Sequence, residues 1–184
     1  MKRFRTLILA LTASAAATQA TPAAAGSAHT SRCTASPAQC RSTERKLDFD
    51  TFLERYEAAN TAFQNGDPNP WLAMTAELEP QSIFGGFGGL GEQGAEDVHQ
   101  RYLLAARAFQ PSGAKLDAEY LVKDVRGRLA YTVAIERSNV LFTGRTELHH
   151  QVLRVTMIFR HERGEWKIVH RHADTMIDLQ LPTT

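Results

Sequence analysis

The chain has 184 residues, of which 43% are hydrophobic and 22% are charged, so its length and composition suit one soluble domain with a buried core. Its 21 basic and 20 acidic residues nearly cancel, and no basic block is longer than a few residues. This balance excludes nucleic acid as an expected partner and implies no other partner held by net charge.

The first 25 residues are typical of a secretory signal peptide. The basic segment MKRFR is followed by the apolar run TLILALTASAAA and then by small residues. Cleavage after Ala20 or after Ala25 would satisfy the small-residue rule. The apolar run is shorter than the roughly 20 residues that span a bilayer, and no cysteine follows a lipoprotein-type box. We therefore expect an exported protein, periplasmic or secreted, without a stable membrane anchor.

Residues 26–46 are rich in Ser, Thr, Ala, Arg and Pro and show no apolar periodicity, which predicts a disordered leader before a domain at 47–180. Cys33 and Cys40 lie in this leader, seven positions apart. An oxidising compartment permits a disulfide between them, and whether they form one stays open. No metal-ligand partners stand beside them at a suitable spacing.

Three helical segments are predicted before residue 110. In LDFDTFLERYEAANTAFQNGD, from Leu47, the apolar residues recur on one helical face and Asn65-Gly66 provides the stop. A shorter helix is predicted from Trp71 to Leu78, and an amphipathic helix over 95–109. Between them, QSIFGGFGGLGEQG lacks the P-loop lysine and serine and the dinucleotide glycine spacing, so it predicts a short strand entering a turn. We expect no bound cofactor.

After Pro111 the apolar period changes to two. Four strands are predicted, KLDAEYLVKDV, RLAYTVAIERSNVLF, ELHHQVLRVTMIFRHE and EWKIVHRHADTMIDL, with glycine-containing turns between them. Long alternating strands joined as hairpins indicate an antiparallel sheet with one buried face. Helices followed by strands on one chain give an α+β fold.

The hairpin LRVTMIFRHERGEWKIVHRHAD, residues 153–174, resembles the last hairpin of the nuclear transport factor 2-like superfamily, in its SnoaL-like and ketosteroid-isomerase-like branch. It also resembles the association domain of calmodulin-dependent kinase II. The resemblance implies a cone, a strongly curved antiparallel sheet wrapped over three helices, with an apolar pocket at its open end. It also implies a homodimer formed through the outer sheet face. Members include isomerases, hydrolases and dehydratases as well as binding or assembly modules, so the fold alone does not assign chemistry. The acid–tyrosine set of ketosteroid isomerases has no residue-by-residue match here.

The last predicted strand carries the candidate catalytic residues. His170, His172 and Asp174 share one strand parity, on the same side as Trp166 and Ile168. His172 oriented by Asp174 would form a proton-transfer pair, with His170 beside it. The alternative is that this face packs in the core and the histidines are satisfied by hydrogen bonds. No metal site is predicted.

The predicted ligand-binding residues are one basic side chain, which can instead form an ion pair, and five aromatic ones: Arg154, Tyr56, Trp71, Phe84, Tyr120 and Tyr131. The sequence thus predicts an exported SnoaL-like domain that binds a small hydrophobic or weakly acidic molecule, with or without cofactor-independent acid–base chemistry. The alternative is a non-catalytic dimeric binding or assembly module.

Overall fold

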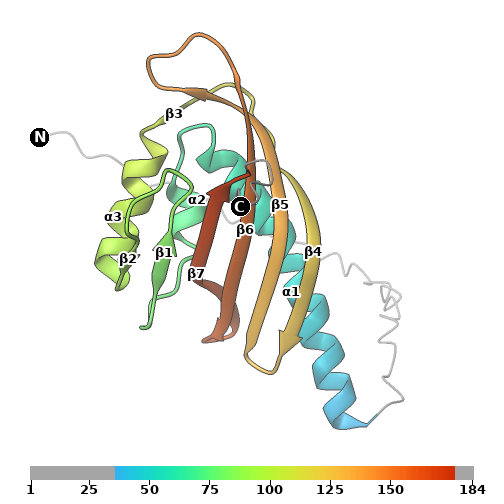
Figure 1. Ribbon diagram of the computed structural model, residues 1–184. Coiled ribbons are helices and arrows are strands. Elements are labelled where there is room, and N and C mark those ends of the chain that lie inside the picture. Colours follow the sequence, from blue (N-terminus) through green and yellow to red (C-terminus); the bar gives the residue numbers. More distant parts are fainter. Residues whose placement is uncertain (1–35, 177–184) are drawn as a thin grey trace, which may run out of the picture. The chain divides into compact units, whose positions relative to one another are not determined.

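The computed structural model describes residues 36–176, which form a curved sheet with helices (Figure 1). The predicted signal peptide and Cys33 lie outside the described residues. The helices are α1 (Pro37–Phe63), α2 (Asn69–Leu72) and α3 (Ala95–Ala106). The strands are β1 (Ser82–Phe84), β2 (Glu92–Gln93), β3 (Phe109–Gln110), β4 (Asp117–Arg126), β5 (Leu129–Phe142), β6 (His149–Glu162) and β7 (Glu165–Thr175). None of the helices in this part of the chain has the length and apolar content to cross a membrane.

Helix α1 begins ten residues earlier than the sequence pattern indicated. The Ser36 hydroxyl accepts a hydrogen bond from the Gln39 backbone N–H, the Gln39 side chain accepts one from the Ser36 N–H, and Pro37 occupies the first turn. Residues 37–46, expected in the disordered leader, are therefore helical. Most of their side chains are exposed, so no apolar period reveals them.

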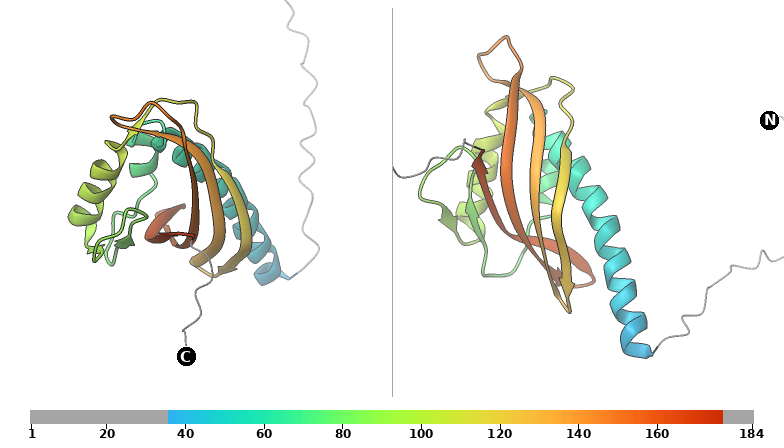
Figure 2. Two further views of the ribbon diagram at one scale, coloured as in Figure 1. Left: turned by 45° about the horizontal axis from the view of Figure 1, so that its top comes forward. Right: turned by 45° about the vertical axis from the view of Figure 1, so that its right-hand side comes forward.

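The central half of α1 supplies the aromatic part of the core. Phe49 contacts Phe159 of β6 and Trp166 of β7 edge-on, with ring centroids 5.2 and 5.1 Å apart. Phe52, 6.0 Å from Phe49, also contacts Phe159 edge-on, with centroids 5.4 Å apart. Edge-to-face rings at these separations add to the free energy of burying their apolar area. This packing fixes α1 across the inner face of the sheet (Figure 2).

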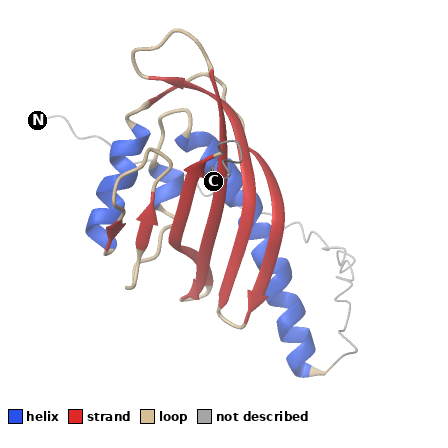
Figure 3. Cartoon of the chain, in the orientation of Figure 1, coloured by secondary structure: helices blue, strands red, loops and turns tan. Residues whose placement is uncertain are grey.

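The sheet confirms the predicted α+β class and its strong curvature, but it is mixed rather than purely antiparallel. Its strand order is β2-β1-β7-β6-β5-β3, and β4 pairs with β5. The four long C-terminal strands pair antiparallel, whereas β1 runs parallel to β7. The helices lie on one side of this sheet, with the loop between β1 and β2 next to α3 (Figure 3). The predicted single short strand is thus the start of a small β1–β2 edge that extends the sheet.

The second predicted helix, Trp71 to Leu78, is wrong in extent. Helix α2 ends at Leu72, and the chain then runs beside β7: Ile168 N–H donates to Met74 O, and Ala76 N–H donates to Ile168 O, both at 2.8 Å. These two hydrogen bonds occupy the backbone groups that a longer helix would need.

Strand β5 buries the opposite face from the one its apolar residues suggest. Most of its inward residues are small or polar, namely the buried Ala130, Thr132, Ala134, Glu136 and Ser138, and Val140 is the apolar exception. Leu129 and Tyr131 lie on the outer face and are 51% and 40% exposed. The strand therefore combines a buried carboxylate with an apolar outer surface.

Candidate functional site

A β-bulge in β7 decides which of its side chains face the helices. Ile158 of β6 pairs with His170, while the next residue, Phe159, pairs with Ile168, so Val169 is an extra residue in β7. An extra residue inverts the side-chain alternation beyond it. Trp166 and Ile168 are buried before the bulge, and after it the buried residues are Arg171 and Ala173.

The predicted catalytic residues therefore lie on the outer face, and the expectation that they share a side with Trp166 and Ile168 is wrong. His172 Nε2 lies 3.8 Å from Asp174 Oδ2, and the side chains are 49% and 44% exposed. Asp174 Oδ1 accepts a 2.8 Å hydrogen bond from Nε of Arg154, the residue predicted to bind a ligand. The structure brings the three together as a surface cluster, away from the interior of the cone.

His170 belongs to the same outer surface. Its Nδ1 lies 2.8 Å from the Ser82 hydroxyl on the parallel neighbour β1, and the Phe84 ring lies edge-on to His170 and His172, at centroid distances of 5.7 and 5.2 Å. Burial, and then the nearby charge of His172, lower the pKa of His170.

Beneath the sheet, Arg171 forms a buried ion pair with Glu136 of β5. Arg171 Nη2 donates to Glu136 Oε2 at 2.8 Å, and Nη1 donates to Oε1 at 3.3 Å and to the Tyr56 hydroxyl oxygen at 2.9 Å. The Tyr56 hydroxyl donates to Glu136 Oε1, and Asn60 Nδ2 donates to Oε2 at 3.3 Å. Both carboxylate oxygens thus accept two hydrogen bonds each, which compensates much of the cost of burying the charge.

The surroundings keep this pair ionised. Burial alone would raise the pKa of Glu136, but the charge of Arg171 and the three hydrogen-bonding side chains outweigh it and hold the pKa below its ordinary value. Burial would lower the pKa of Arg171, and the charge of Glu136 raises it instead. Burial, followed by the charge of Glu136, raises the pKa of Tyr56, so its hydroxyl keeps its proton.

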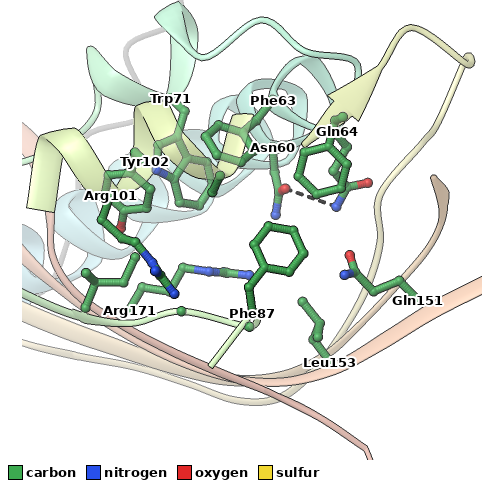
Figure 4. Close-up of a pocket in the computed structure, with 15 residues that line it drawn as sticks. Asn60, Phe63, Gln64, Trp71, Phe87, Arg101, Tyr102, Gln151, Leu153 and Arg171 are labelled. Carbon is green, nitrogen blue, oxygen red and sulfur yellow. Dashed lines mark hydrogen bonds between the residues drawn. The ribbon is translucent and has the colours of Figure 1, made fainter. Parts of the chain in front are cut away.

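A pocket opens beside this network, between the helices, the β1–β2 loop and the inner face of the sheet (Figure 4). It encloses about 570 Å³ of empty volume including its open mouth, of which about 70 Å³ is accessible to the centres of water molecules. Its aromatic walls come from α1, α2, the β1–β2 loop, α3 and β3: Phe63, Trp71, Phe87, Tyr102 and Phe109. Burial raises the pKa of Tyr102 to about 12, so this wall is uncharged at neutral pH.

The polar side chains that line the pocket are amides and guanidinium groups. Gln64 Nε2 donates to Asn60 Oδ1 at 3.1 Å, while the buried Gln64 Oε1 has no hydrogen-bond partner among residues 36–176. Arg101 and Arg171 line the same pocket, and the Arg171 guanidinium lies 5.5 Å from the centre of the Trp71 ring. The pocket can therefore offer aromatic contact and positive charge to a small molecule, with the Gln64 amide in its wall.

The predicted ligand-binding aromatic residues divide between several places. Trp71 lines the pocket, and Tyr56 lies behind it in the Glu136 network. Phe84 and Tyr131 are exposed outside, at 46% and 40%. Tyr120 packs against the core away from the pocket, and burial, then the charge of Glu57, raises its pKa.

Arg101, Glu136 and Arg171 are the residues that the sequence pattern missed. Arg171 falls on the wrong parity unless the bulge at Val169 is known. Glu136 could have been found from the sequence. Every second residue of β5 from Ala130 to Ser138 is small or polar, these positions are the buried ones, and Glu136 is the charged residue among them. Within the described chain, no three His, Cys, Asp or Glu side chains are placed to share a metal ion.

Solved structures with the same fold are distant in sequence. A nuclear transport factor 2-like superfamily protein from Salmonella enterica has a TM-score of 0.60 and 15% identity, over 77% of this chain and 96% of that one. A candidate dehydratase of the same family from Streptomyces avermitilis has a TM-score of 0.54 and 21% identity, over 70% and 99%. A candidate calmodulin-dependent kinase II association domain from Thiobacillus denitrificans has a TM-score of 0.53 and 14% identity, over 67% and 93%.

At these identities the likeness shows the fold alone. No curated protein of known function matches the sequence. The family model for SnoaL-like domains matches residues 53–178, which is more than half of the chain and covers α1 from its central half through β7. The chain therefore belongs to the SnoaL-like domain family.

Proposed function

We propose that this protein binds one small, largely apolar molecule in the pocket beside Arg171. The observation that carries the proposal is the pocket itself: aromatic walls from five segments meet beside two guanidinium groups and the Gln64 amide. Concave sites with mostly apolar walls and a few convergent polar groups are the usual form of small-molecule sites.

The size of the pocket restricts the ligand. The cavity of about 70 Å³ is about half the volume of one that holds benzene. A single ring fits only if part of it occupies the mouth or if Phe87 moves. Phe87 is 48% exposed and follows Gly85-Gly86 on the loop between β1 and β2, so it is the most exposed of the aromatic wall residues.

The chemistry of the lining supports binding more directly than catalysis. The ionisable groups that line it are two arginines and a tyrosine, and the Glu136 carboxylate paired with Arg171 already accepts four hydrogen bonds. None of these groups is a ready proton acceptor at neutral pH. The predicted His172–Asp174 pair stands on the other face of the sheet, so the proposal gives it no role in the pocket.

A matched pair of substitutions on α3 tests the proposal. Ala105 lines the pocket, and Ala105→Phe should fill it; its neighbour Leu104 is 59% exposed, and Leu104→Phe adds similar bulk outside. Thermal unfolding is followed with toluene, phenol, benzamide and benzoate. We expect at least one compound to raise the Tm of the wild type and of Leu104→Phe but not that of Ala105→Phe. The same response in all three proteins, or none in any, would overturn the proposal.

We also propose that two copies associate through the outer sheet face. Leu129, Tyr131 and Ile158 are exposed on neighbouring strands, where Tyr131 pairs with Ile158, so their side chains form one apolar surface. Light scattering on the eluting protein should give the mass of a dimer, and Ile158→Lys should give a monomer that still responds to pocket ligands. A monomeric wild type at micromolar concentration would refute this association.

A further inference from the structure

We infer that the pocket ligand is a carboxylate, and that Arg101 and Arg171 bind the carboxylate group between them. The inference rests on the proposed function and names the chemical class of the ligand. Arg101 comes from α3 and Arg171 from β7, and both line the same pocket. Figure 4 shows their guanidinium groups on one side of Phe87, with Gln64 and Gln151 on the other.

Arg171 is held in place and still has donors to offer. Its Nη1 and Nη2 atoms contact Glu136 and Tyr56, which fix the plane of the guanidinium. Its Nε has no hydrogen-bond acceptor among the residues that the structure describes, and a guanidinium carries five N–H donors. A guanidinium that is held rigidly and keeps some of its N–H donors unused suits a planar oxyanion such as a carboxylate.

Arg101 is the less closely paired of the two arginines. Its side chain is 15% exposed, yet the closest carboxylate oxygen, Oε1 of Glu92, lies 3.7 Å from Nη1, beyond good hydrogen-bonding distance. The other oxygen of Glu92 is buried with no hydrogen-bond partner among the described residues. Arg101 Nη2 also donates to the Gly88 carbonyl oxygen of the β1–β2 loop. Nε and Nη1 of Arg101 thus have no hydrogen-bond acceptor among the described residues, and a ligand carboxylate at the pocket would meet a guanidinium with unused donors.

The fit of Arg101 against the loop depends on Gly85. A Cβ atom at Gly85 would lie 3.1 Å from Nε and from Nη2 of Arg101, closer than such atoms normally approach. The absence of a side chain lets the Nε–Nη2 edge of the guanidinium lie close against the loop at the edge of the pocket. The site thus has a built position for the second guanidinium rather than a side chain free in solvent.

The other side of the pocket indicates a hydrogen-bond donor on the ligand. Gln64 Oε1 is buried and unpaired, while its Nε2 is committed to Asn60. Turned into the pocket, this oxygen would accept a hydrogen bond from a ligand hydroxyl, and its unmade hydrogen bond is otherwise costly. A single ring with a carboxylate at one end and a hydroxyl at the other matches the arginines, the aromatic walls and the amide in that order.

Three ligands of similar size separate the need for a carboxylate from the need for a hydroxyl: benzamide, benzoate and 4-hydroxybenzoate. Each is titrated calorimetrically into the full chain at pH 7. We expect benzoate to bind about tenfold or more tightly than benzamide, because hydrogen bonds to charged groups are among the strongest. We expect 4-hydroxybenzoate to bind more tightly again. Arg101→Met should bring the affinity for benzoate down to that for benzamide and leave benzamide unchanged. Arg107→Met, at the exposed C-cap of the same helix, removes the same charge and should change neither.

The outcomes distinguish this inference from the proposed function. Equal affinities for benzoate and benzamide, both lost in Ala105→Phe, would refute the carboxylate and leave a pocket for apolar ligands. Loss of benzoate binding in Arg107→Met as well would show a general charge effect and would also refute it. If neither probe binds the wild type, the carboxylate inference is wrong. Arg101→Lys, which keeps the charge without the fork, should retain part of the preference for benzoate and guards against an effect of misfolding in Arg101→Met.

Discussion

The buried pair of Arg171 and Glu136 allows a quantitative prediction. Glu136→Gln keeps the shape of the side chain and an acceptor for Tyr56, but it leaves the Arg171 guanidinium buried without its counter-charge. Removing one partner of a buried pair costs about 3–5 kcal/mol in the free energy of unfolding. Arg171→Met removes the other partner and should cost a similar amount. For a domain of this size the loss lowers the Tm by about 10 °C or more.

The double variant tests the physical reason. With both charges gone no unpaired ion remains, so Glu136→Gln with Arg171→Met should cost no more than either single change, which gives a coupling of about 3 kcal/mol or more. Urea unfolding measures the free energies. The matched control is Arg154→Met with Asp174→Asn, a pair with the same 2.8 Å contact whose side chains are 54% and 44% exposed. Its coupling should be about 1 kcal/mol or less. Additive costs at the buried pair would refute the reasoning.

Two further changes have definite expected outcomes. The pKa of His170 lies below the ordinary 6.5, so near and below that pH the unfolded chain binds more protons than the folded one, and the free energy of unfolding should fall as the pH is lowered. His170→Gln should make this decrease smaller in urea titrations at pH 7 and pH 5. His99→Gln, on an exposed position of α3, should leave it unchanged. At Gly91, with φ of +91°, a Cβ would lie 2.4 Å from the Phe84 ring, whereas at Gly113, with φ of +70°, it would meet open space; Gly113→Ala should cost about 1–2 kcal/mol by backbone strain alone, and Gly91→Ala clearly more. Equal costs for the two glycines would show that the contact with Phe84 is relieved without penalty.

The sequence predicted the elements of the fold because their patterns are local. The period of 3.6 around Tyr56 and the period of two after Pro111 follow from the face that each element buries. The start of α1 was missed because residues 37–46 bury little and so carry no pattern. The local signals of this start were the Ser36–Gln39 capping box and Pro37 in the first turn.

The candidate site was harder to predict because it depends on pairing between strands. The extra residue Val169 is visible only when β7 is aligned with β6. It places Arg171, instead of His170 and His172, on the inner face. The same limit applied to β5, where the apolar residues lie outside and Glu136 inside. Periodicity separates the residues of a strand into two faces, but which face is buried depends on how the whole sheet pairs and packs.

A crystal structure of the protein with 4-hydroxybenzoate would test the binding site most directly. We predict density for the ligand between α3 and the inner face of β7, with its carboxylate oxygens about 2.7–2.9 Å from nitrogens of Arg101 and Arg171, and with Phe87 displaced from the mouth. Density on the outer face beside His172 and Asp174, with the inner pocket unchanged, would contradict it.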